Sequence, residues 1–147
     1  MEVISQENRW EIKKIGLLNY WWYDEEEFEF SDGRLILRGT NGSGKSVTMQ
    51  SFIPLLLDGN KSPERLDPFN TRARKIEDYI LGYGDDIKDE NTSYLYMEFC
   101  KKQTKQYLTI GMGLRAKKNN GVTFWGFLIN DGRRIGKDFY LYKDIGN

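Results

Sequence analysis

The chain contains no histidine and only one cysteine, Cys100, among its 147 residues. Without imidazole there is no histidine-based catalysis and no histidine-ligated zinc, and a single thiol forms neither an internal disulfide nor a cysteine metal cluster. No apolar run approaches the roughly 18 residues needed to cross a bilayer. The first ten residues lack a basic segment followed by an apolar stretch, so we expect no signal peptide. These absences predict a cytoplasmic protein without a membrane partner.

Charge is balanced over the whole chain but not along it. Lys and Arg number 22 and Asp and Glu number 22, which gives a formal net charge of zero. Residues 1–98 carry 12 basic and 19 acidic side chains, whereas residues 99–147 carry 10 basic and 3 acidic ones. This balance argues against a uniformly basic nucleic-acid-binding module. The basic second part is either a solvated surface or a contact for a polyanion such as DNA.

The first forty residues predict strands. Partial alternation of apolar residues over 10–18 predicts a strand in which Gly16 is a bulge or a point of close packing. A turn containing Asp-Gly joins segments 25–30 and 34–38, which predicts a hairpin. Because the second of these segments has three consecutive aliphatic residues at its centre, we expect it to be buried on both faces.

The rest of the chain predicts two helices and then more strands. Residues 47–57 have helical apolar spacing, and Pro54 is expected to kink or end that helix near its last turns. A second, short helix is expected over 71–81. The segments that follow are rich in aromatic and β-branched residues and predict an antiparallel meander. They are 94–100, 107–114, 122–129 and 139–142.

The segment Gly39–Ser46 reads G-T-N-G-S-G-K-S and matches the phosphate-loop pattern G-x-x-x-x-G-K-[ST] at every fixed position. Its glycines let the backbone wrap around a phosphate, and the helix that follows adds free amides and its dipole. Lys45 is expected to reach the β- and γ-phosphates and the Ser46 hydroxyl to coordinate Mg²⁺. The alternative is a glycine-rich turn at a helix start. The predicted nucleotide contacts are Asn41, Gly42, Ser43, Gly44, Lys45, Ser46 and Val47, with weaker ones from Gly39 and Thr40.

Hydrolysis by phosphate-loop proteins also requires an acidic residue at the end of a buried strand, which holds Mg²⁺ and positions water. Glu98 follows the strand-like run 94–97, but the strand continues beyond it, so we expect Glu98 on the polar face of that strand. Asp58, at a helix end, and Asp131, in a turn, are no better placed. The sequence therefore holds half of an ATPase site.

Further segments extend this pattern over almost the whole chain. They are Arg9-Trp10, 16–21, 28–30, 34–46, 55–59, 63–69, 94–99 and 111–115. Together they resemble the start of SMC/MukB-type ATPases, most closely the MukB-like large subunit of Wadjet-type bacterial systems that act against plasmids. The phosphate loop alone indicates only a P-loop protein, and the flanking segments narrow the resemblance.

The resemblance implies an α/β fold, a P-loop NTPase of the ABC/SMC-head type. Residues 1–147 are then the N-terminal lobe of a split head, with the phosphate loop at 39–46 and antiparallel strands over about 94–142. In such families a long coiled coil follows, and a C-terminal segment returns with the Walker B acid and the signature motif. This chain stops before any coiled coil and has no Leu-Ser-Gly-Gly-like signature, so we expect a fragment with negligible hydrolysis of its own.

The resemblance also implies the ligands and partners. ATP and Mg²⁺ are the cofactors, held between two heads whose engagement drives DNA loop extrusion or DNA clamping. Expected partners are a second ATPase head, the chain's own C-terminal head segment, kleisin-like and accessory subunits, DNA and, in Wadjet, a topoisomerase-like nuclease. One alternative is a self-sufficient small P-loop kinase or nucleotide hydrolase. Another is a nucleotide-regulated binding module without turnover.

Three residues outside the loop are weaker candidates. Trp22 lies in an aromatic run about twenty residues before the loop, where ABC-type ATPases often carry a ring that stacks on adenine. Packing within a hairpin is the simpler role for this run. Arg72 and Arg74 follow the first expected helix, where SMC-type heads present an arginine to nucleotide or DNA, although a solvated helix start explains them equally.

Overall fold

The structure, a computed structural model, describes residues 8–57, 59–60 and 75–141. These residues contain one five-stranded sheet of order β2-β1-β3-β4-β5, in which every neighbouring pair of strands is antiparallel. The strands are β1 (Glu11–Tyr20), β2 (Tyr23–Glu29), β3 (Glu90–Lys101), β4 (Gln106–Lys117) and β5 (Gly121–Ile129). The helices are short: α1 (Lys45–Ser51), α2 (Ile53–Leu56), α4 (Ile76–Leu81) and the 3₁₀ turn η2 (Gly84–Asp86).

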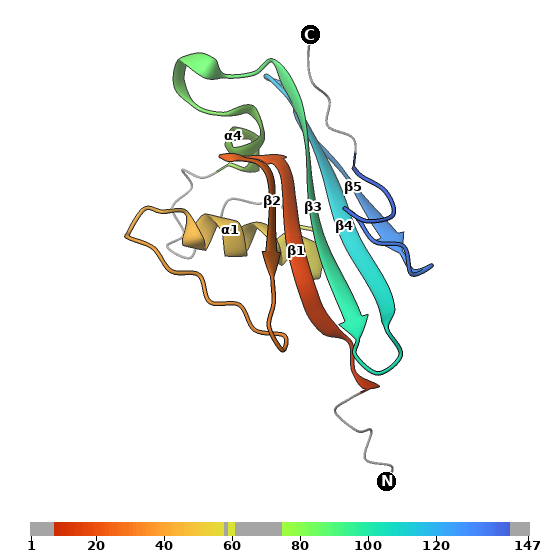
Figure 1. Ribbon diagram of the computed structural model, residues 1–147. Helices are drawn as coiled ribbons and strands as arrows, with labels where there is room; N and C mark the ends of the chain where they lie inside the picture. Colours follow the sequence, from red (N-terminus) through yellow and green to blue (C-terminus); the bar gives the residue numbers. More distant parts are fainter. Residues whose placement is uncertain (1–7, 58, 61–74, 142–147) are drawn as a thin grey trace.

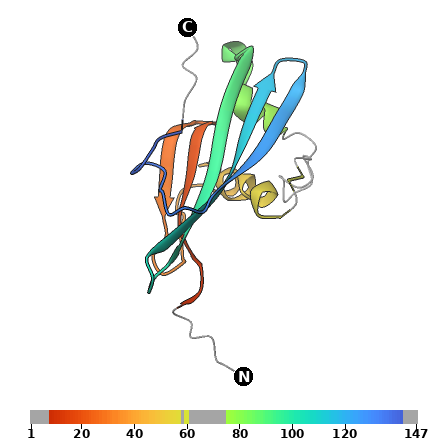
Figure 2. The same ribbon diagram turned by 90° about the vertical axis from the view of Figure 1, so that its right-hand side faces the viewer.

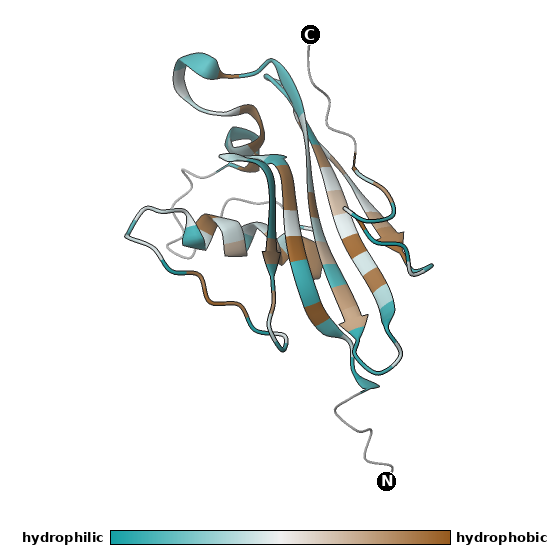
Figure 3. Cartoon of the chain, in the orientation of Figure 1, coloured by the Kyte–Doolittle hydropathy of each residue, from teal (hydrophilic) through white to brown (hydrophobic). Residues whose placement is uncertain are grey.

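The helices cover one face of the sheet, and Figures 1 and 2 show them together on that side. Alternate residues of a strand face opposite sides of the sheet, and Figure 3 shows bands of hydrophobic and hydrophilic residues along the strands. The core residues of β1, β3 and β4 lie at alternate positions on the helix side. They pack against the apolar side of α4 and against α1 to form the core. The core contains Ile15, Leu17, Leu95, Met97, Met112, Leu114 and Ala116 from the strands, and Val47, Phe52, Ile76, Tyr79, Ile80 and Leu81 from the helical segments.

The opposite face is partly covered by the segment 130–141, which we call the strap. Arg134 of the strap forms a two-pronged ion pair with Glu98 of β3, at 3.1 Å from Nε to Oε2 and 2.7 Å from the second nitrogen to Oε1. Lys14 of β1 donates to the carbonyl oxygen of Ile135 at 2.9 Å and to Glu27 of β2 at 2.7 Å. Glu98 is fully buried and Lys14 is 6% exposed, so the strap closes over charges that already have partners.

Glycines on the strap face make room for aromatic rings from neighbouring strands. A Cβ atom added at Gly16 would lie 2.1 Å from the ring of Tyr96, its cross-strand neighbour. A Cβ atom at Gly111 would lie 2.0 Å from the ring of Phe127. The expected close packing at Gly16 is therefore confirmed, while the irregularity of the strand lies nearby, between Ile12 and Lys14.

The expected fold, an α/β P-loop NTPase of the ABC/SMC-head type, is wrong. All strand pairs among the described residues are antiparallel, and helices are few and short. The segment 34–38, which was to form the buried strand leading into the phosphate loop, is not a strand, and Ile36 is 77% exposed. Three consecutive aliphatic residues do not by themselves make a strand: beyond Arg34 the segment leaves β2, which stays an edge strand of the described sheet. Of the hairpin predicted for 25–38 only the turn forms, closed by an antiparallel bridge between Ser31 and Arg34, while β2 pairs with β1.

Most other elements lie where the sequence predicts them. The segments 94–100, 107–114 and 122–129 fall within β3, β4 and β5. The helix expected at 47–57 is divided at Phe52, and Pro54 is placed in the first turn of α2. The second helix is confirmed for α4, whereas 71–74 lie outside the described residues. No strand forms over 139–141, the described part of the segment 139–142.

Candidate phosphate-binding site

The phosphate loop 39–46 links the turn after β2 to α1 as an exposed, tightly curved segment. Gly42 and Gly44 have φ angles of +83° and +87°, a left-handed conformation that side chains other than glycine rarely adopt. Gly39 has a different reason to be glycine, because a Cβ atom there would lie 2.5 Å from the hydroxyl oxygen of Ser43. The pattern of glycines therefore corresponds to real conformational needs of this loop.

Lys45 turns its side chain back toward the loop that precedes it. Its ammonium nitrogen donates to the carbonyl oxygens of Gly39 and Thr40, at 2.7 and 2.8 Å, and lies 3.2 Å from the Ser43 hydroxyl oxygen. All three acceptors are neutral, and among the described residues Lys45 has no ion pair with a carboxylate. Within the described part of the chain, the positive charge of the loop is therefore hydrogen-bonded but not paired with a negative charge.

The loop borders an open hollow of about 480 Å³. Its walls are Trp21, Asn41, Gly42, Ser43, Gly44, Lys45, Ser46 and Val47. The residues from Asn41 to Val47 expected to contact nucleotide are thus brought together around one space, while Gly39 and Thr40 contribute the carbonyl acceptors for Lys45. No carboxylate is among the described residues that line this hollow, so an anion would meet only neutral groups and one ammonium.

Two tyrosines of the β1–β2 hairpin hydrogen-bond to the middle and the end of α1. The Thr48 hydroxyl donates to the carbonyl oxygen of Gly44 at 3.0 Å and is 2.8 Å from the hydroxyl of Tyr23. One turn further on, a hydrogen bond of 3.0 Å joins the hydroxyls of Ser51 and Tyr20. Burial raises the pKa of Tyr20, so this phenol stays protonated over the physiological range. Since α1 has only seven residues, these anchors rather than its dipole fix the loop.

Trp21, which the sequence did not single out, lies closest to the loop. A Cβ atom at Gly44 would lie 2.3 Å from two ring carbons of Trp21. Trp22, the residue expected to stack on adenine, is 79% exposed and does not line the hollow; its ring meets the edge of Trp21 instead. The two residues form the two-residue turn between Tyr20 and Tyr23. The geometry of that turn decides which of the two indoles faces the loop. The sequence alone therefore did not distinguish Trp21 from Trp22.

Two of the carboxylates considered for Mg²⁺ are already paired. Glu98 does not lie on a solvated polar face, because it is fully buried on the strap side of the sheet and bound by Arg134. Asp131 accepts from Arg133 at 2.7 Å. Neither of these two lines the hollow at the loop. Asp58 lies outside the described residues, as do Arg72 and Arg74.

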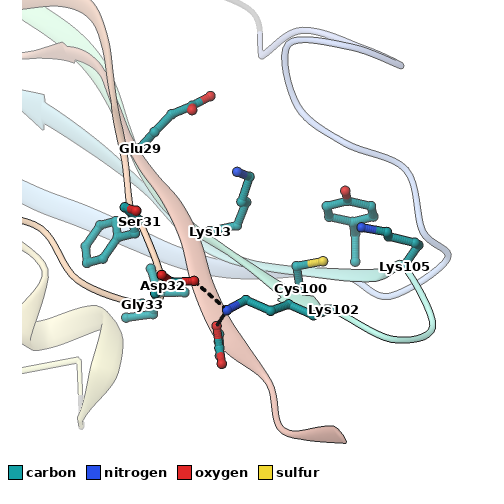
Figure 4. Close-up of a pocket in the computed structure, with 12 residues that line it drawn as sticks. Lys13, Glu29, Ser31, Asp32, Gly33, Cys100, Lys102 and Lys105 are labelled. Atoms are coloured by element: carbon teal, nitrogen blue, oxygen red, sulfur yellow. Dashed lines mark hydrogen bonds and ion pairs between the residues drawn. The ribbon is translucent and has the colours of Figure 1, made fainter. Parts of the chain in front are cut away.

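A second hollow, of about 610 Å³, lies at the other end of the sheet (Figure 4). Three lysines and three carboxylates are among its lining residues, so its charges balance. Lys102 bridges two of the carboxylates, at 2.7 Å from Asp32 and 3.0 Å from Glu11. Its hydrogen bonds to Asp32 and then Glu11 raise the pKa of Lys102, and the same contact lowers the pKa of Asp32. This neutral, internally paired hollow contrasts with the uncompensated charge at Lys45.

Within the described ranges, no helix is long and apolar enough to cross a membrane. The same residues contain no group of three or more histidine, cysteine or acidic side chains suited to hold a metal ion. Comparison of the sequence with protein-family models and with curated proteins finds no match.

Proposed function

We propose that the loop 39–46 binds the phosphates of ATP together with Mg²⁺, as the nucleotide-binding part of an SMC-like ATPase that handles DNA. The observation that carries the first half of this proposal is the Lys45 ammonium in a glycine-rich loop, which among the described residues has only neutral hydrogen-bond acceptors. The identification with SMC-like ATPases and with DNA is supported by the sequence resemblance alone.

A polyphosphate is the ligand that suits these groups best. An ammonium ion gains more from a phosphate oxygen than from neutral carbonyls, because a hydrogen bond between two ionised groups is about twice as strong. Lys45 can therefore exchange its bonds to Gly39 and Thr40 for bonds to a phosphate that enters the hollow. Two left-handed glycines in the loop let the backbone approach the ligand closely without side chains in the way.

Ser46 is the residue proposed to hold Mg²⁺. Its side chain is exposed at the end of the loop and borders the hollow. Mg²⁺ commonly takes only one or two protein ligands and completes its shell with phosphate oxygens and water. A single hydroxyl therefore fits an ion that arrives with ATP, whereas it would not hold the ion alone. Bound there, the ion would neutralise charge on the β- and γ-phosphates.

Turnover is not expected from these residues alone. Phosphoryl transfer to water requires a group that positions the attacking water, and no described residue around the hollow carries a carboxylate. Glu98, the one buried acid considered for this role, is bound by Arg134 on the other face of the sheet. This argues for a binding role that another segment completes and against a self-sufficient small hydrolase.

The proposed partners are a second ATPase head, a C-terminal head segment of the same protein, kleisin-like and accessory subunits, and DNA. Apolar side chains on both sides of the loop offer contact surface for such a segment: Ile36, Met49, Leu56 and Leu57 are 77, 44, 50 and 65% exposed. DNA contact is assigned to the basic second part of the chain. Of its lysines, Lys102 is engaged with Asp32 and Glu11, which leaves Lys105, Lys117 and Lys118 as better candidates.

Isothermal titration of the protein with ATP and Mg²⁺ tests the proposal. We expect saturable binding that weakens when Ser46→Ala removes the Mg²⁺ ligand, together with phosphate release at the background rate. AMP serves as the matched ligand control, because it keeps the adenosine and lacks the β- and γ-phosphates. Equal affinity for AMP and ATP would show that the loop does not bind polyphosphate. Multiple turnovers abolished by Ser46→Ala would favour the hydrolase.

A further inference from the structure

Trp21 has a backbone conformation unusual for a bulky residue. Its φ angle is +56°, in the left-handed region that side chains other than glycine, Asn and Asp rarely enter. A residue held there costs of order 1–3 kcal/mol and persists only where its surroundings demand it. In a two-residue hairpin turn glycine would adopt this angle at no cost. The tryptophan side chain therefore has a contact that outweighs the strain.

The surroundings of Trp21 fix its indole on several sides. Its backbone N–H donates to the carbonyl oxygen of Tyr79 in α4 at 2.5 Å. Its ring meets the rings of Trp22, Tyr23 and Tyr79 edge to face, with centroids 6.0, 6.0 and 6.3 Å away. Such pairs add about 0.5–1.5 kcal/mol each beyond area burial. The indole is thus held between the hairpin turn and a buried helix.

The free end of this fixed indole is directed at the phosphate loop. A Cβ atom at position 44 would lie only 2.3 Å from the ring atoms Cη2 and Cζ3 of Trp21, so the indole fills the space that a side chain there would need. Gly44 is also the residue whose carbonyl oxygen accepts from Thr48, so its backbone is held from two sides. The next residue is Lys45. The contact therefore acts on the backbone that presents the phosphate-binding groups.

We infer that Trp21 is a positioning residue for phosphate binding: its indole packs on Gly44 and keeps the loop in the conformation that receives a polyphosphate. The inference rests on the proposed function and adds a residue that the phosphate-loop pattern does not contain. It differs from stacking on a nucleotide base, because the part of the ring near the site touches loop backbone. Removal of the indole leaves the loop free to move, and binding must then order it again.

The test compares two ligands that share phosphates but not a base: ATP and inorganic tripolyphosphate, each with Mg²⁺. We expect Trp21→Ala to weaken both by about tenfold, since a loop that must be ordered on binding loses affinity for any polyphosphate. Trp21→Phe should recover part of this loss for both ligands. Loss of ATP binding alone, with tripolyphosphate unchanged, would assign Trp21 to the base and overturn the inference.

Two glycines of the loop provide a matched pair for the same contact. Alanine at position 44 or at position 42 meets a similar left-handed backbone strain, but only at position 44 does it collide with Trp21. We expect Gly44→Ala to weaken tripolyphosphate binding several-fold more than Gly42→Ala does. In the Trp21→Ala background this difference should disappear. A difference that persists without the indole would contradict the inference.

Folding and ligand controls keep the two proposals apart. Trp10→Ala removes a 41% exposed indole that lies against Lys101 before the start of β1, away from the loop, and should leave tripolyphosphate affinity within about twofold of the wild type. Circular dichroism and urea unfolding identify a variant that has lost its fold, in which case the glycine pair decides. If the wild-type protein binds neither ligand, the proposed function fails and the inference with it. If it binds both and Trp21→Ala changes neither, only the inference fails.

Discussion

Two lysines, one under the strap and one in the phosphate loop, have opposite environments. Lys14 lies under the strap, 6% exposed, and its ammonium reaches the Glu27 carboxylate and the carbonyl oxygen of Ile135. Lys45 also reaches carbonyl oxygens, but in an exposed loop and with no carboxylate among the described residues. The first charge is neutralised and buried. The second is hydrogen-bonded only to neutral acceptors among the described residues, which is why we propose it as the contact for a polyphosphate.

The same contrast extends to the regions around the two lysines. The strap face is closed by side chains that contact one another over long sequence distances, such as Arg134 with Glu98. The loop around Lys45 is exposed, and the hydrogen bonds of its ammonium are to residues only two to six positions away in the sequence. We therefore expect substitutions under the strap to change the free energy of unfolding and substitutions in the loop to change ligand affinity.

The largest effect on stability is expected from Arg134→Ala. It leaves the Glu98 carboxylate buried without a counter-charge, which costs about 3–5 kcal/mol of the free energy of unfolding. Urea unfolding followed by circular dichroism measures this loss. Arg133→Ala is the control, because its ion pair with Asp131 is exposed and is worth at most about 1 kcal/mol. Similar losses for both arginines would show that the strap pair is not buried in solution.

A smaller loss is expected from Gly111→Ala. The new methyl group would collide with the ring of Phe127, and such overpacking costs about 1–3 kcal/mol. Gly126→Ala in the next strand is the control, since its Cβ would find no atom closer than 3.9 Å. Thermal unfolding of both variants checks the difference. The packing of aromatic rings over glycine would be refuted by equal melting temperatures.

A modest pH effect is expected at Glu27. Burial raises the pKa of this carboxyl, but hydrogen bonds from Lys14 and Tyr96 outweigh it and leave the pKa lowered. Its contribution is therefore present above about pH 4.5, the ordinary glutamate value, and is lost as the pH falls through the lower folded-state pKa. Solvent screening limits it to about 1 kcal/mol or less.

Urea midpoints between pH 2 and 7 check this expectation. Glu27→Gln should lower stability at pH 7 and flatten the acid limb, so that wild type and variant converge at low pH. Glu26→Gln, an exposed neighbour in β2, serves as the control for removing one charge. A Glu27→Gln curve parallel to the wild-type curve would contradict the role of this contact.

The strands were predictable where alternation was strong, and so was the loop. The apolar alternation of β1, β3 and β5 and the spacing of α4 specify these elements locally. The place of 34–38 was not predictable, because a strand exists only with a paired neighbour, and three aliphatic residues do not show that the segment leaves β2 after the bridge between Ser31 and Arg34. Glu98 was misplaced because its partner Arg134 is 36 residues away. Trp21 was missed because only the turn distinguishes its orientation from that of Trp22.

The smallest expected change in stability accompanies the largest change in binding. Lys45→Ala removes exposed hydrogen bonds to the loop's own backbone, so the free energy of unfolding should change by no more than about 0.5 kcal/mol. Lys14→Ala, its counterpart under the strap, should cost about 1–3 kcal/mol, because it leaves buried acceptors without their donor.

Titration of ATP–Mg²⁺ into the wild type, Lys45→Ala and Lys14→Ala tests the central claim most directly. The measurement is made below the unfolding temperature of each variant, so that all three chains are folded. We predict that Lys45→Ala lowers the affinity for ATP at least about tenfold, which is the effect of losing one hydrogen bond between charged groups. We predict that Lys14→Ala keeps the affinity within about twofold of the wild type. Undiminished ATP affinity in folded Lys45→Ala would contradict the account.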